Sequence, residues 1–320
     1  MIKAAVIGVG SLGRHHARIY SELEGVALVA VCDTNEARAR EYAAQYGCHA
    51  VTDYRDLLGE VDAASVAAPT VDHARIGCDL LAAGIAMLIE KSIVASFEEA
   101  DRLVAAARDA GAVLQIGHVE RFNPAVRAAA GVVTTPRFIE CHRLAAFTPR
   151  SLDIDVVMDL MIHDIDVILS LVDSEVAEIH AADIGILTEK VDIANARIEF
   201  ENGCIANVTA SRVSSERVRK IRLFQPSDYV SIDYAGREVS VVSLVPPKPG
   251  DERPQIAARK VEVEDVEPLK AEIEAFLAAV RGEQASAVSG EDGRRALDVA
   301  MRVLTSIDRH AKKVGIAHGS

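Results

Sequence analysis

The most constraining feature of the sequence is a glycine-rich turn near its start. An apolar run at residues 4–7 leads into Gly8, Gly10 and Gly13, which have the spacing G-x-G-x-x-G. A helix-favouring segment and a second apolar run follow, and that run ends at Asp33. This order of strand, glycine turn, helix, strand and acid is the context in which the spacing indicates dinucleotide binding. The alternatives are that the turn binds another nucleotide, or that the fold is kept without a bound nucleotide.

Each glycine has a separate reason in this interpretation. Gly8 permits the tight turn, Gly10 lets the backbone approach a pyrophosphate, and Gly13 lets the helix pack closely on the strand. The first N–H groups of a helix have no partner within it, and they favour anions. We therefore expect Ser11, Leu12 and Gly13 to hold the diphosphate of the cofactor.

Asp33 favours NAD over NADP as that cofactor. A carboxylate after the second strand accepts hydrogen bonds from the adenosine ribose and repels a 2′-phosphate. Thr34 and Asn35, which follow, offer no arginine for that phosphate. Arg38 and Arg40 are expected to lie a helical turn or more away.

Length and charge exclude several classes of protein. The 320 residues are enough for two domains, and the formal net charge of −13 argues against nucleic acid or an anionic membrane as the main partner. The five cysteines lack metal-type spacing and indicate reduced thiols. No signal peptide precedes the first strand, and the longest apolar run, 80–89, is too short to span a bilayer. We expect a cytoplasmic protein.

Residues 1–120 alternate between strand and helix, which predicts a Rossmann-type, doubly wound parallel sheet. Ser96 is the expected N-cap of one helix. The predicted strands are 4–7, 26–31, 63–67, 85–89 and 113–116, and the predicted helices are 14–23, 36–46, 71–83 and 97–110.

Residues 121–320 follow a different pattern, which predicts an α+β domain. Asn123-Pro124 indicates a helix start, Asn202-Gly203 a hairpin, and 246–254 a surface loop. We expect an open, mostly antiparallel sheet with helices on one face and the other available for oligomerisation. The predicted helices are 124–130, 154–172, 268–280 and 290–310, and the predicted strands are 137–146, 194–200, 204–210, 221–225, 229–234 and 238–244.

Lys91 directly follows a predicted strand of the first domain, together with Glu90. Ligands bind at the carboxyl edge of such sheets, and a lysine there stabilises a substrate oxygen as it becomes a carbonyl. The alternative is a solvated loop lysine.

Asp159, His163 and Asp166 are spaced four and three apart in an otherwise apolar helix. These spacings place all three on one face. A carboxylate beside an imidazole fixes its tautomer and suits it to act as a general base. A structural hydrogen-bonded pair and a metal site are the alternatives, although no further ligand set is evident, so no metal is predicted.

Together with Pro69 and His73, these motifs resemble the Gfo/Idh/MocA family of sugar and cyclitol oxidoreductases over essentially the whole chain. The family usually has Glu-Lys-Pro, and Ser92 stands here in place of the proline. The resemblance implies that Lys91 orients the substrate hydroxyl and that His163 takes its proton with help from Asp159. It also implies an NAD or NADP cofactor near Thr70, His73 and Glu90, and a homodimer or homotetramer.

The segment 117–124 looks like the domain junction in family members similar to UDP-N-acetylglucosamine 3-dehydrogenases. This makes Arg121 and Asn123 candidates for substrate contact. Alternatively, Arg121 pairs with Glu90 or Glu120, and Asn123 only caps a helix. A basic set suits either a substrate diphosphate or a solvated face. Its members are Arg143, Arg150, Arg212, Arg217, Arg219, Lys220 and Arg222.

The sequence therefore predicts an NAD-dependent dehydrogenase that oxidises a ring hydroxyl of a sugar, with a nucleotide sugar as first choice. The same chemistry on a free aldose or inositol is one alternative. A dinucleotide-binding regulatory protein without turnover is the other, and Lys91, Asp159 and His163 together argue against it.

Overall fold

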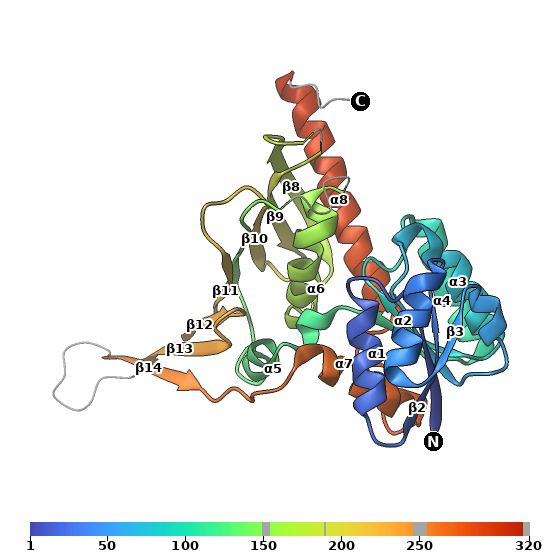
Figure 1. Cartoon of the computed structure of the whole chain (residues 1–320). Helices are drawn as coiled ribbons and strands as arrows, with labels where there is room; N and C mark the ends of the chain where they lie inside the picture. The colour runs from blue at the N-terminus through green and yellow to red at the C-terminus, as the bar shows by residue number, and fades with distance from the viewer. Residues whose placement is uncertain (149–153, 189, 246–254, 316–320) are drawn as a thin grey trace. The chain divides into compact units, whose positions relative to one another are not determined.

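The computed structural model describes residues 1–148, 154–188, 190–245 and 255–315. These form two compact units (Figure 1). Met1–Val119 and Glu267–Leu297 make up the first, and Glu120–Val266 with Asp298–Ser320 make up the second. The segment Glu267–Leu297, which the sequence places in the second domain, thus groups with the first.

The first unit, which the structure describes throughout, contains a six-stranded parallel sheet in the order β3-β2-β1-β4-β5-β6. This is the predicted doubly wound fold, and the strand order reverses between β1 and β4. Its strands are β1 (Ile2–Ile7), β2 (Val26–Cys32), β3 (His49–Val51), β4 (Ala63–Val66), β5 (Ala86–Glu90) and β6 (Leu114–Gly117). Its helices are α1 (Gly13–Glu22), α2 (Glu36–Tyr46), α3 (Thr70–Ala82), α4 (Phe97–Ala110) and α7 (Pro268–Val280), with a 3₁₀ turn η1 (Tyr54–Leu57).

Local sequence signals explain most of these boundaries. The hydroxyl of Ser96 accepts a hydrogen bond from the Glu99 N–H and caps α4, as predicted, and Asn35 caps α2 in the same way. Helix α7 belongs here because Ile273, Phe276 and Leu277 are buried in the core that β1, α1 and β5 share. Burial of such side chains is worth about 1.5–3 kcal/mol each, so this late segment stabilises the first sheet.

Eight strands of the second unit, counted over its described residues, form a sheet in the order β14-β13-β12-β11-β7-β10-β9-β8. Only the β7–β10 pair among them is parallel, so the sheet is mixed and mostly antiparallel. Its strands are β7 (Phe138–Leu144), β8 (Val176–Ile184), β9 (Ile193–Phe200), β10 (Ile205–Ser211), β11 (Val218–Phe224), β12 (Asp228–Asp233), β13 (Glu238–Val245) and β14 (Gln255–Val261). The helical segments are η2 (Val119–Phe122), α5 (Pro124–Ala130), a π-helical turn η3 (Val157–Met161), α6 (Ile162–Leu171) and α8 (Gly290–Val314), which begins in the first unit.

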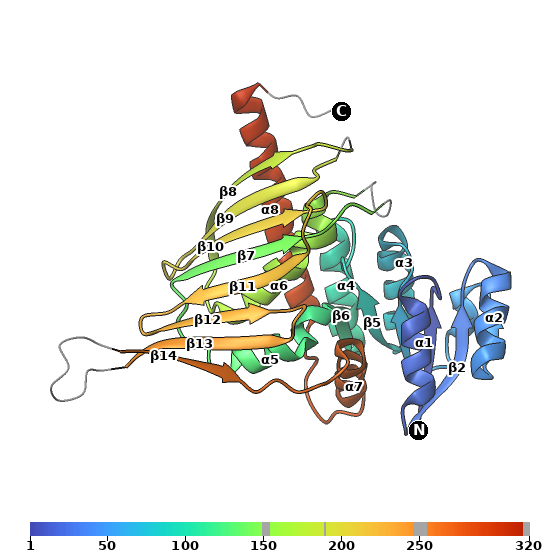
Figure 2. The ribbon, with the colours of Figure 1, turned by 60° about the vertical axis from the view of Figure 1, so that its left-hand side comes forward.

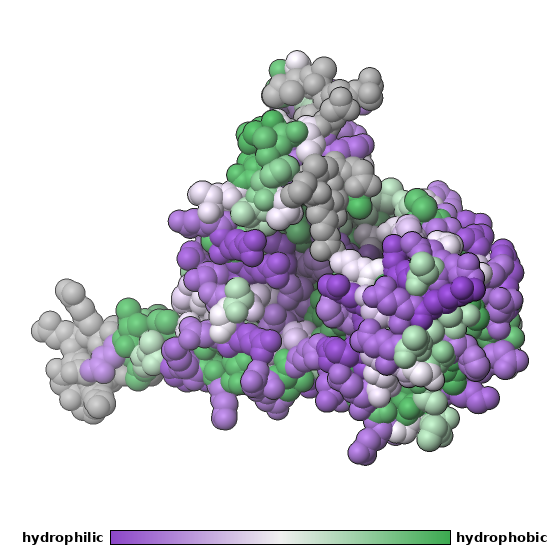
Figure 3. Space-filling view, viewed as in Figure 1, coloured by the Kyte–Doolittle hydropathy of each residue, from purple (hydrophilic) through white to green (hydrophobic). Residues whose placement is uncertain are grey.

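Helices cover one face of this sheet and leave the other open (Figure 2). On the open face, six residues of neighbouring strands pair in register and form a continuous apolar row. The rings of Phe138, Phe224 and Tyr229 pack against one another along it, tilted by 39°, with centroid distances of 5.6 and 5.0 Å. Further apolar surface lies along β13 and β14 and at the tip of the β8–β9 connection (Figure 3). The apolar row of the open face, from β10 to β14, consists of Ile205, Phe138, Phe224, Tyr229, Val242 and Ala258.

The structure corrects several of the predicted elements. Strands β3, β8 and β14 are additions, and the predicted helix 154–172 is a π-helical turn followed by α6. The expected loop at 246–254 lies outside the described residues. Helix α8 extends to Val314. None of the helices within the described ranges combines the length and the apolar character that a bilayer crossing needs.

Candidate active site

The predicted cofactor residues of the first unit gather at the carboxyl edge of its parallel sheet. Gly8 follows β1, Asp33 follows β2, Pro69 follows β4, and Lys91 follows β5. Gly8, Gly10, Asp33 and Pro69 line one cleft of about 570 Å³ beside the point where the strand order reverses. Ligands of doubly wound sheets bind at this switch point.

The geometry of the glycine turn leaves no room for side chains at two of its three glycines. Gly8 has a φ of +85°, and a Cβ there would lie 2.7 Å from the carbonyl oxygen of Ala67. A Cβ on Gly13 would lie 1.7 Å from the carbonyl oxygen of Gly8. Around Gly10 the nearest side-chain atom is Arg38 Nη1 at 3.8 Å, so space remains above its backbone for a ligand. The turn therefore fits a pyrophosphate at the start of α1, where Ser11 and Leu12 are exposed.

Asp33 is buried and its carboxylate organises the loops around it. Oδ2 accepts a hydrogen bond from the Val9 N–H at 3.1 Å, and Oδ1 accepts one from the Asn35 N–H at 2.8 Å. Carboxylate oxygens have further lone pairs. Asp33 therefore holds the glycine turn against β2 and has acceptor capacity left for ribose hydroxyls.

The structure corrects the expected position of Arg38. Its Nη1 donates to Asp33 Oδ2 at 3.2 Å instead of lying a helical turn away. Asn35 caps α2, so Arg38 stands in the first turn of that helix, directly over the end of β2. The carboxylate that would repel a 2′-phosphate thus has a cation beside it. Arg40 pairs with Glu36 instead.

Three further residues of the cleft were not singled out from the sequence. Tyr54 begins η1, and the guanidinium groups of Arg55 and Arg75 lie 5.0 and 5.3 Å from its ring centroid. Arg75 also donates to the Tyr54 hydroxyl at 3.0 Å. Two cations this close to one ring are attracted to it, so they help to hold Tyr54 in place in the cleft. No short motif marks these residues, because η1 and α3 come together only in the fold.

Glu90 lies in the interior at the end of β5, where His16 of α1 holds it. His16 Nε2 is 2.9 Å from Glu90 Oε1, and His16 Nδ1 is 3.0 Å from the hydroxyl of Ser65. Tyr20 extends this chain with its hydroxyl 2.9 Å from that of Ser65. The residue before Lys91 is therefore fixed to the helix that follows the glycine turn. His16 was missed because a lone histidine in a helix carries no specific signal.

His73 is also buried, between two loops of the first unit. Its Nε2 lies 2.8 Å from the carbonyl oxygen of Ala68, and its Nδ1 lies 3.0 Å from that of Ser92. Thr70 begins the helix that carries it. The Lys91–Ser92 peptide bond is cis, at the position where the family usually has proline. His73 thus ties the loop after β4 to the loop that presents the partly exposed Lys91.

In the second unit, Asp159 lies in the π-helical turn η3 and His163 in the first turn of α6. Both are partly exposed, whereas Val157, Met161 and Ile165 are buried. Single π-helical turns are frequently found at functional sites. The structure therefore keeps the His163 imidazole and the Asp159 carboxylate partly exposed on a segment with many buried apolar side chains.

The other carboxylates of α6 are engaged in buried ion pairs. Asp166 binds Arg121 through two hydrogen bonds of 2.8 and 3.1 Å, and Asp164 binds Arg143 through two of 2.7 and 2.8 Å. Arg121 thus pairs with Asp166, a partner that the sequence did not suggest. Burial alone would lower the pKa of Arg143, but Asp164 raises it well above its usual range. Arg143 is thus a permanent buried cation.

Asn123 is buried and caps α5. Its Oδ1 accepts from the Ala125 N–H at 3.1 Å, and its amide donates to Glu120 Oε2, also at 3.1 Å. Glu120 in turn accepts from Arg143 at 3.0 Å. These contacts give Asn123 a structural role, and its contact with substrate, like that of Arg121, stays a prediction.

The basic set divides in the structure. Arg143 and Arg212 are buried in ion pairs, with Asp164 and Asp192 respectively. Lys220 pairs with Asp233 and Arg222 with Glu140 on the sheet surface, and Arg217 and Arg219 are exposed. Arg150 lies outside the described residues. Among the described side chains, no group of three or more His, Cys, Asp or Glu is placed to hold a metal ion.

A glycine turn at the switch point of a doubly wound sheet, with an acid after the second strand, defines a dinucleotide-binding protein of the Rossmann type. Residues 2–118 match the model of the oxidoreductase family with an NAD-binding Rossmann fold, and residues 125–224 match that of the GFO/IDH/MocA C-terminal domain. The chain belongs to the Gfo/Idh/MocA family of oxidoreductases.

Individual relatives resemble the chain over nearly its full length. It is 39% identical over 315 residues to the UDP-N-acetylglucosamine 3-dehydrogenase of Acidithiobacillus ferrooxidans, which covers 96% of this chain and 97% of the relative. A solved structure of UDP-N-acetylglucosamine 3-dehydrogenase GnnA from that organism matches with a TM-score of 0.89 at 38% identity, over 96% of this chain and 98% of the other. An inositol 2-dehydrogenase of Rhizobium meliloti is 25% identical over 323 residues, 96% of this chain and 97% of the relative.

Substitution of two glycines should separate ligand binding from folding. Gly10→Ala adds a methyl group where the protein has room, so stability should stay near wild type while NAD affinity falls about tenfold or more. Gly13→Ala forces α1 away from the Gly8 carbonyl, and such overpacking costs about 1–3 kcal/mol. Urea unfolding and calorimetric titration with NAD measure the two effects. Wild-type NAD affinity in Gly10→Ala would contradict this assignment.

Proposed function

We propose that this chain is an NAD-dependent dehydrogenase that oxidises a ring hydroxyl of a nucleotide sugar, with the 3-hydroxyl of UDP-N-acetylglucosamine as the first choice. The observation that carries the proposal is the 39% identity to a UDP-N-acetylglucosamine 3-dehydrogenase over 96% of the chain. Inositol 2-dehydrogenases are the second candidate class, supported by the weaker full-length similarity at 25% identity.

The proposed chemistry assigns roles to residues of both units. Lys91 orients the substrate hydroxyl and supports its oxygen as negative charge develops. His163 removes the hydroxyl proton, and Asp159 holds the imidazole in the tautomer that accepts it. A bound nicotinamide dinucleotide accepts the hydrogen of the carbinol carbon as hydride. The alcohol loses two electrons and two hydrogens, and the proton leaves through His163.

The preference for NAD rests on Asp33, which has acceptor capacity for the ribose hydroxyls. Arg38 lies 3.2 Å from the same carboxylate and reduces the repulsion of a 2′-phosphate. We therefore propose NAD as the better cofactor, with turnover of NADP at a lower rate. The thiols, among them buried Cys32 with its pKa raised to about 12 by burial, take no part in this chemistry.

A substrate panel tests the proposal. UDP-N-acetylglucosamine, N-acetylglucosamine and myo-inositol are offered with NAD or NADP, and the absorbance of reduced nicotinamide is followed. We expect UDP-N-acetylglucosamine with NAD to have the highest kcat/KM, by about tenfold or more over the free sugar, because binding energy from remote substrate groups is used at the reacting centre. Higher kcat/KM with inositol would select the second class. Binding of NAD without turnover of any sugar would indicate a regulatory protein.

Replacement of His163 should remove the base. His163→Ala is expected to lower kcat by roughly 10²–10⁴, the usual contribution of a positioned acid–base group, and to abolish the rise of kcat with pH that deprotonation of an imidazole produces. His180→Ala is the matched control, because His180 is an exposed histidine of the same unit. A kcat near wild type in His163→Ala would refute the assignment.

We further propose that the open face of the second sheet joins subunits into a homodimer or homotetramer. The apolar row across six strands is the support, since contiguous exposed apolar surface marks interaction sites. Tyr229→Lys places a charge within this row and should weaken the assembly by at least about tenfold in Kd, because an unpaired charge is costly to bury. Leu58→Lys, on the surface of the first unit, is the control. Light scattering against protein concentration measures the effect, and a wild-type monomer would contradict the proposal.

A further inference from the structure

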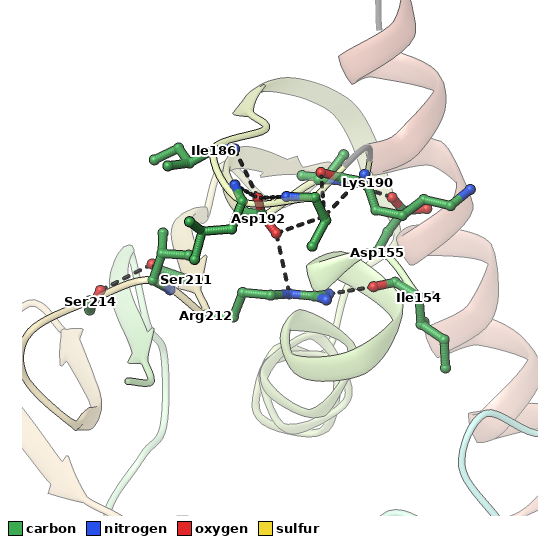
Figure 4. Close-up of polar contacts among 12 residues, drawn as sticks. Ile154, Asp155, Ile186, Lys190, Asp192, Ser211, Arg212 and Ser214 are labelled. Atoms are coloured by element: carbon green, nitrogen blue, oxygen red, sulfur yellow. Dashed lines mark hydrogen bonds and ion pairs between the residues drawn. The ribbon is translucent and has the colours of Figure 1, made fainter. Parts of the chain in front are cut away.

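The connection between β8 and β9 is organised around one buried carboxylate. Asp192 is fully buried, and its Oδ2 accepts hydrogen bonds from three consecutive backbone N–H groups, while Oδ1 accepts one from a hydroxyl (Figure 4). Burial would raise the pKa of Asp192, but these N–H groups lower it below its ordinary value, so the group is ionised. The donors are the N–H groups of Ile186, Leu187 and Thr188 at 2.8, 2.6 and 2.9 Å, and the Thr188 hydroxyl at 2.9 Å.

Arg212 joins this connection to a second segment. Its guanidinium Nε lies 3.9 Å from Asp192 Oδ1, and its Nη2 donates to the carbonyl oxygen of Ile154. The side chain points between the two partners (Figure 4). The backbone N–H of Arg212 also donates to the Asp192 carbonyl at 3.1 Å. One planar cation just after β10 thus bridges the β8–β9 connection and the residues that precede η3.

Two more hydrogen bonds fix the same residues from the other side. The Val191 N–H donates to the Asp155 carboxylate at 3.1 Å, and the Val156 N–H donates to the Val191 carbonyl at 3.0 Å. The Asp159 N–H then donates to the Asp155 carbonyl at 2.9 Å. Every residue from Ile154 to Val156 is therefore held immediately before the turn that carries Asp159.

This placement matters because a π-helical turn sets the rotation of the helix that continues from it. His163 stands two residues after the end of η3, so a shift in the entry of the turn moves both Asp159 and the imidazole. A misplacement of about 1 Å can cost on the order of 10²-fold in rate. A buried ion pair contributes little net stability compared with apolar packing, so its retention here calls for another reason.

We infer that Arg212 is a positioning residue for the base: by bridging Asp192 and the Ile154 carbonyl it fixes the entry of η3 and thereby the place of His163. The inference rests on the proposed function, in which His163 removes the hydroxyl proton. Arg212 itself is not proposed to touch substrate or cofactor. Its role is to lock the backbone from which the base projects.

The test compares Arg212→Met, which removes the bridge, with Arg212→Lys, which keeps the charge but loses the planar fork. Arg309→Met is the matched control, because Arg309 is an exposed arginine of α8 in the same unit and is not part of the sheet. The assay measures kcat per NAD-binding subunit, so that loss of folded protein does not count as loss of rate. Amide hydrogen exchange of the peptide 154–163 gives a readout that needs no substrate.

We expect Arg212→Met to lower kcat about 10- to 100-fold while the Kd for NAD stays unchanged, and to speed exchange in 154–163. Arg212→Lys should recover part of both, and Arg309→Met should match wild type. Should Arg212→Met fail to fold, Asp155→Ala removes one tie alone and should give the same two effects, more weakly.

Wild-type kcat per NAD-binding subunit or unchanged exchange in Arg212→Met would overturn the inference. Failure of the proposed function has a different signature: His163→Ala would then keep its rate, or no sugar would be oxidised by the wild-type protein. In that case faster exchange in Arg212→Met would still show that the Arg212 bridge holds residues 154–163 in place, but the claim that it positions a base would be overturned.

Discussion

The close approach of α1 to the end of β1 is the constraint on which the cofactor site depends. At Gly13 a Cβ would lie 1.7 Å from the Gly8 carbonyl, so the helix reaches this position only because Gly13 lacks a side chain. The approach directs the start of α1 at the switch point of the sheet and sets His16 beside Glu90 at 2.9 Å. The missing side chain of Gly13 therefore helps to position both the start of α1, where an anion can bind, and Glu90, the last residue of β5.

Ion pairs account for the buried carboxylates of helix α6 in the second unit. The helix α6 carries carboxylates on a largely apolar segment, and a buried carboxylate is stable only when paired and hydrogen-bonded. Arg143 and Arg121 satisfy Asp164 and Asp166, which leaves Asp159 and His163 as the partly exposed polar pair of the segment. The spacing of four and three predicts Asp166 on one face with Asp159 and His163, and the structure pairs its buried carboxylate with Arg121.

The sequence predicted the elements whose signals are local. Helices α2, α4 and α7 have the predicted bounds because caps, a proline and apolar periodicity define them. Strands β3 and β14 were not predicted because one is short and the other is exposed along most of its length, so neither shows a buried pattern. The glycine turn was predictable because its signal is also local. The contact of Arg38 with Asp33 was not, because it depends on where α2 begins relative to the end of β2.

The ion pairs and hydrogen bonds of the arginines could not be predicted from local signals, because their partners lie far away in the sequence. The partners of Arg121, Arg143 and Arg212 lie 45, 21 and 58 positions away along the chain. A basic residue in a sequence has the same appearance whether it will bind a phosphate, face water or neutralise a buried acid. Only burial separates these cases, since a cation without water must be matched by nearby acceptors. In this chain the arginines that resembled a diphosphate site are therefore divided by the fold, and the buried ones, Arg143 and Arg212, neutralise the buried carboxylates of Asp164 and Asp192.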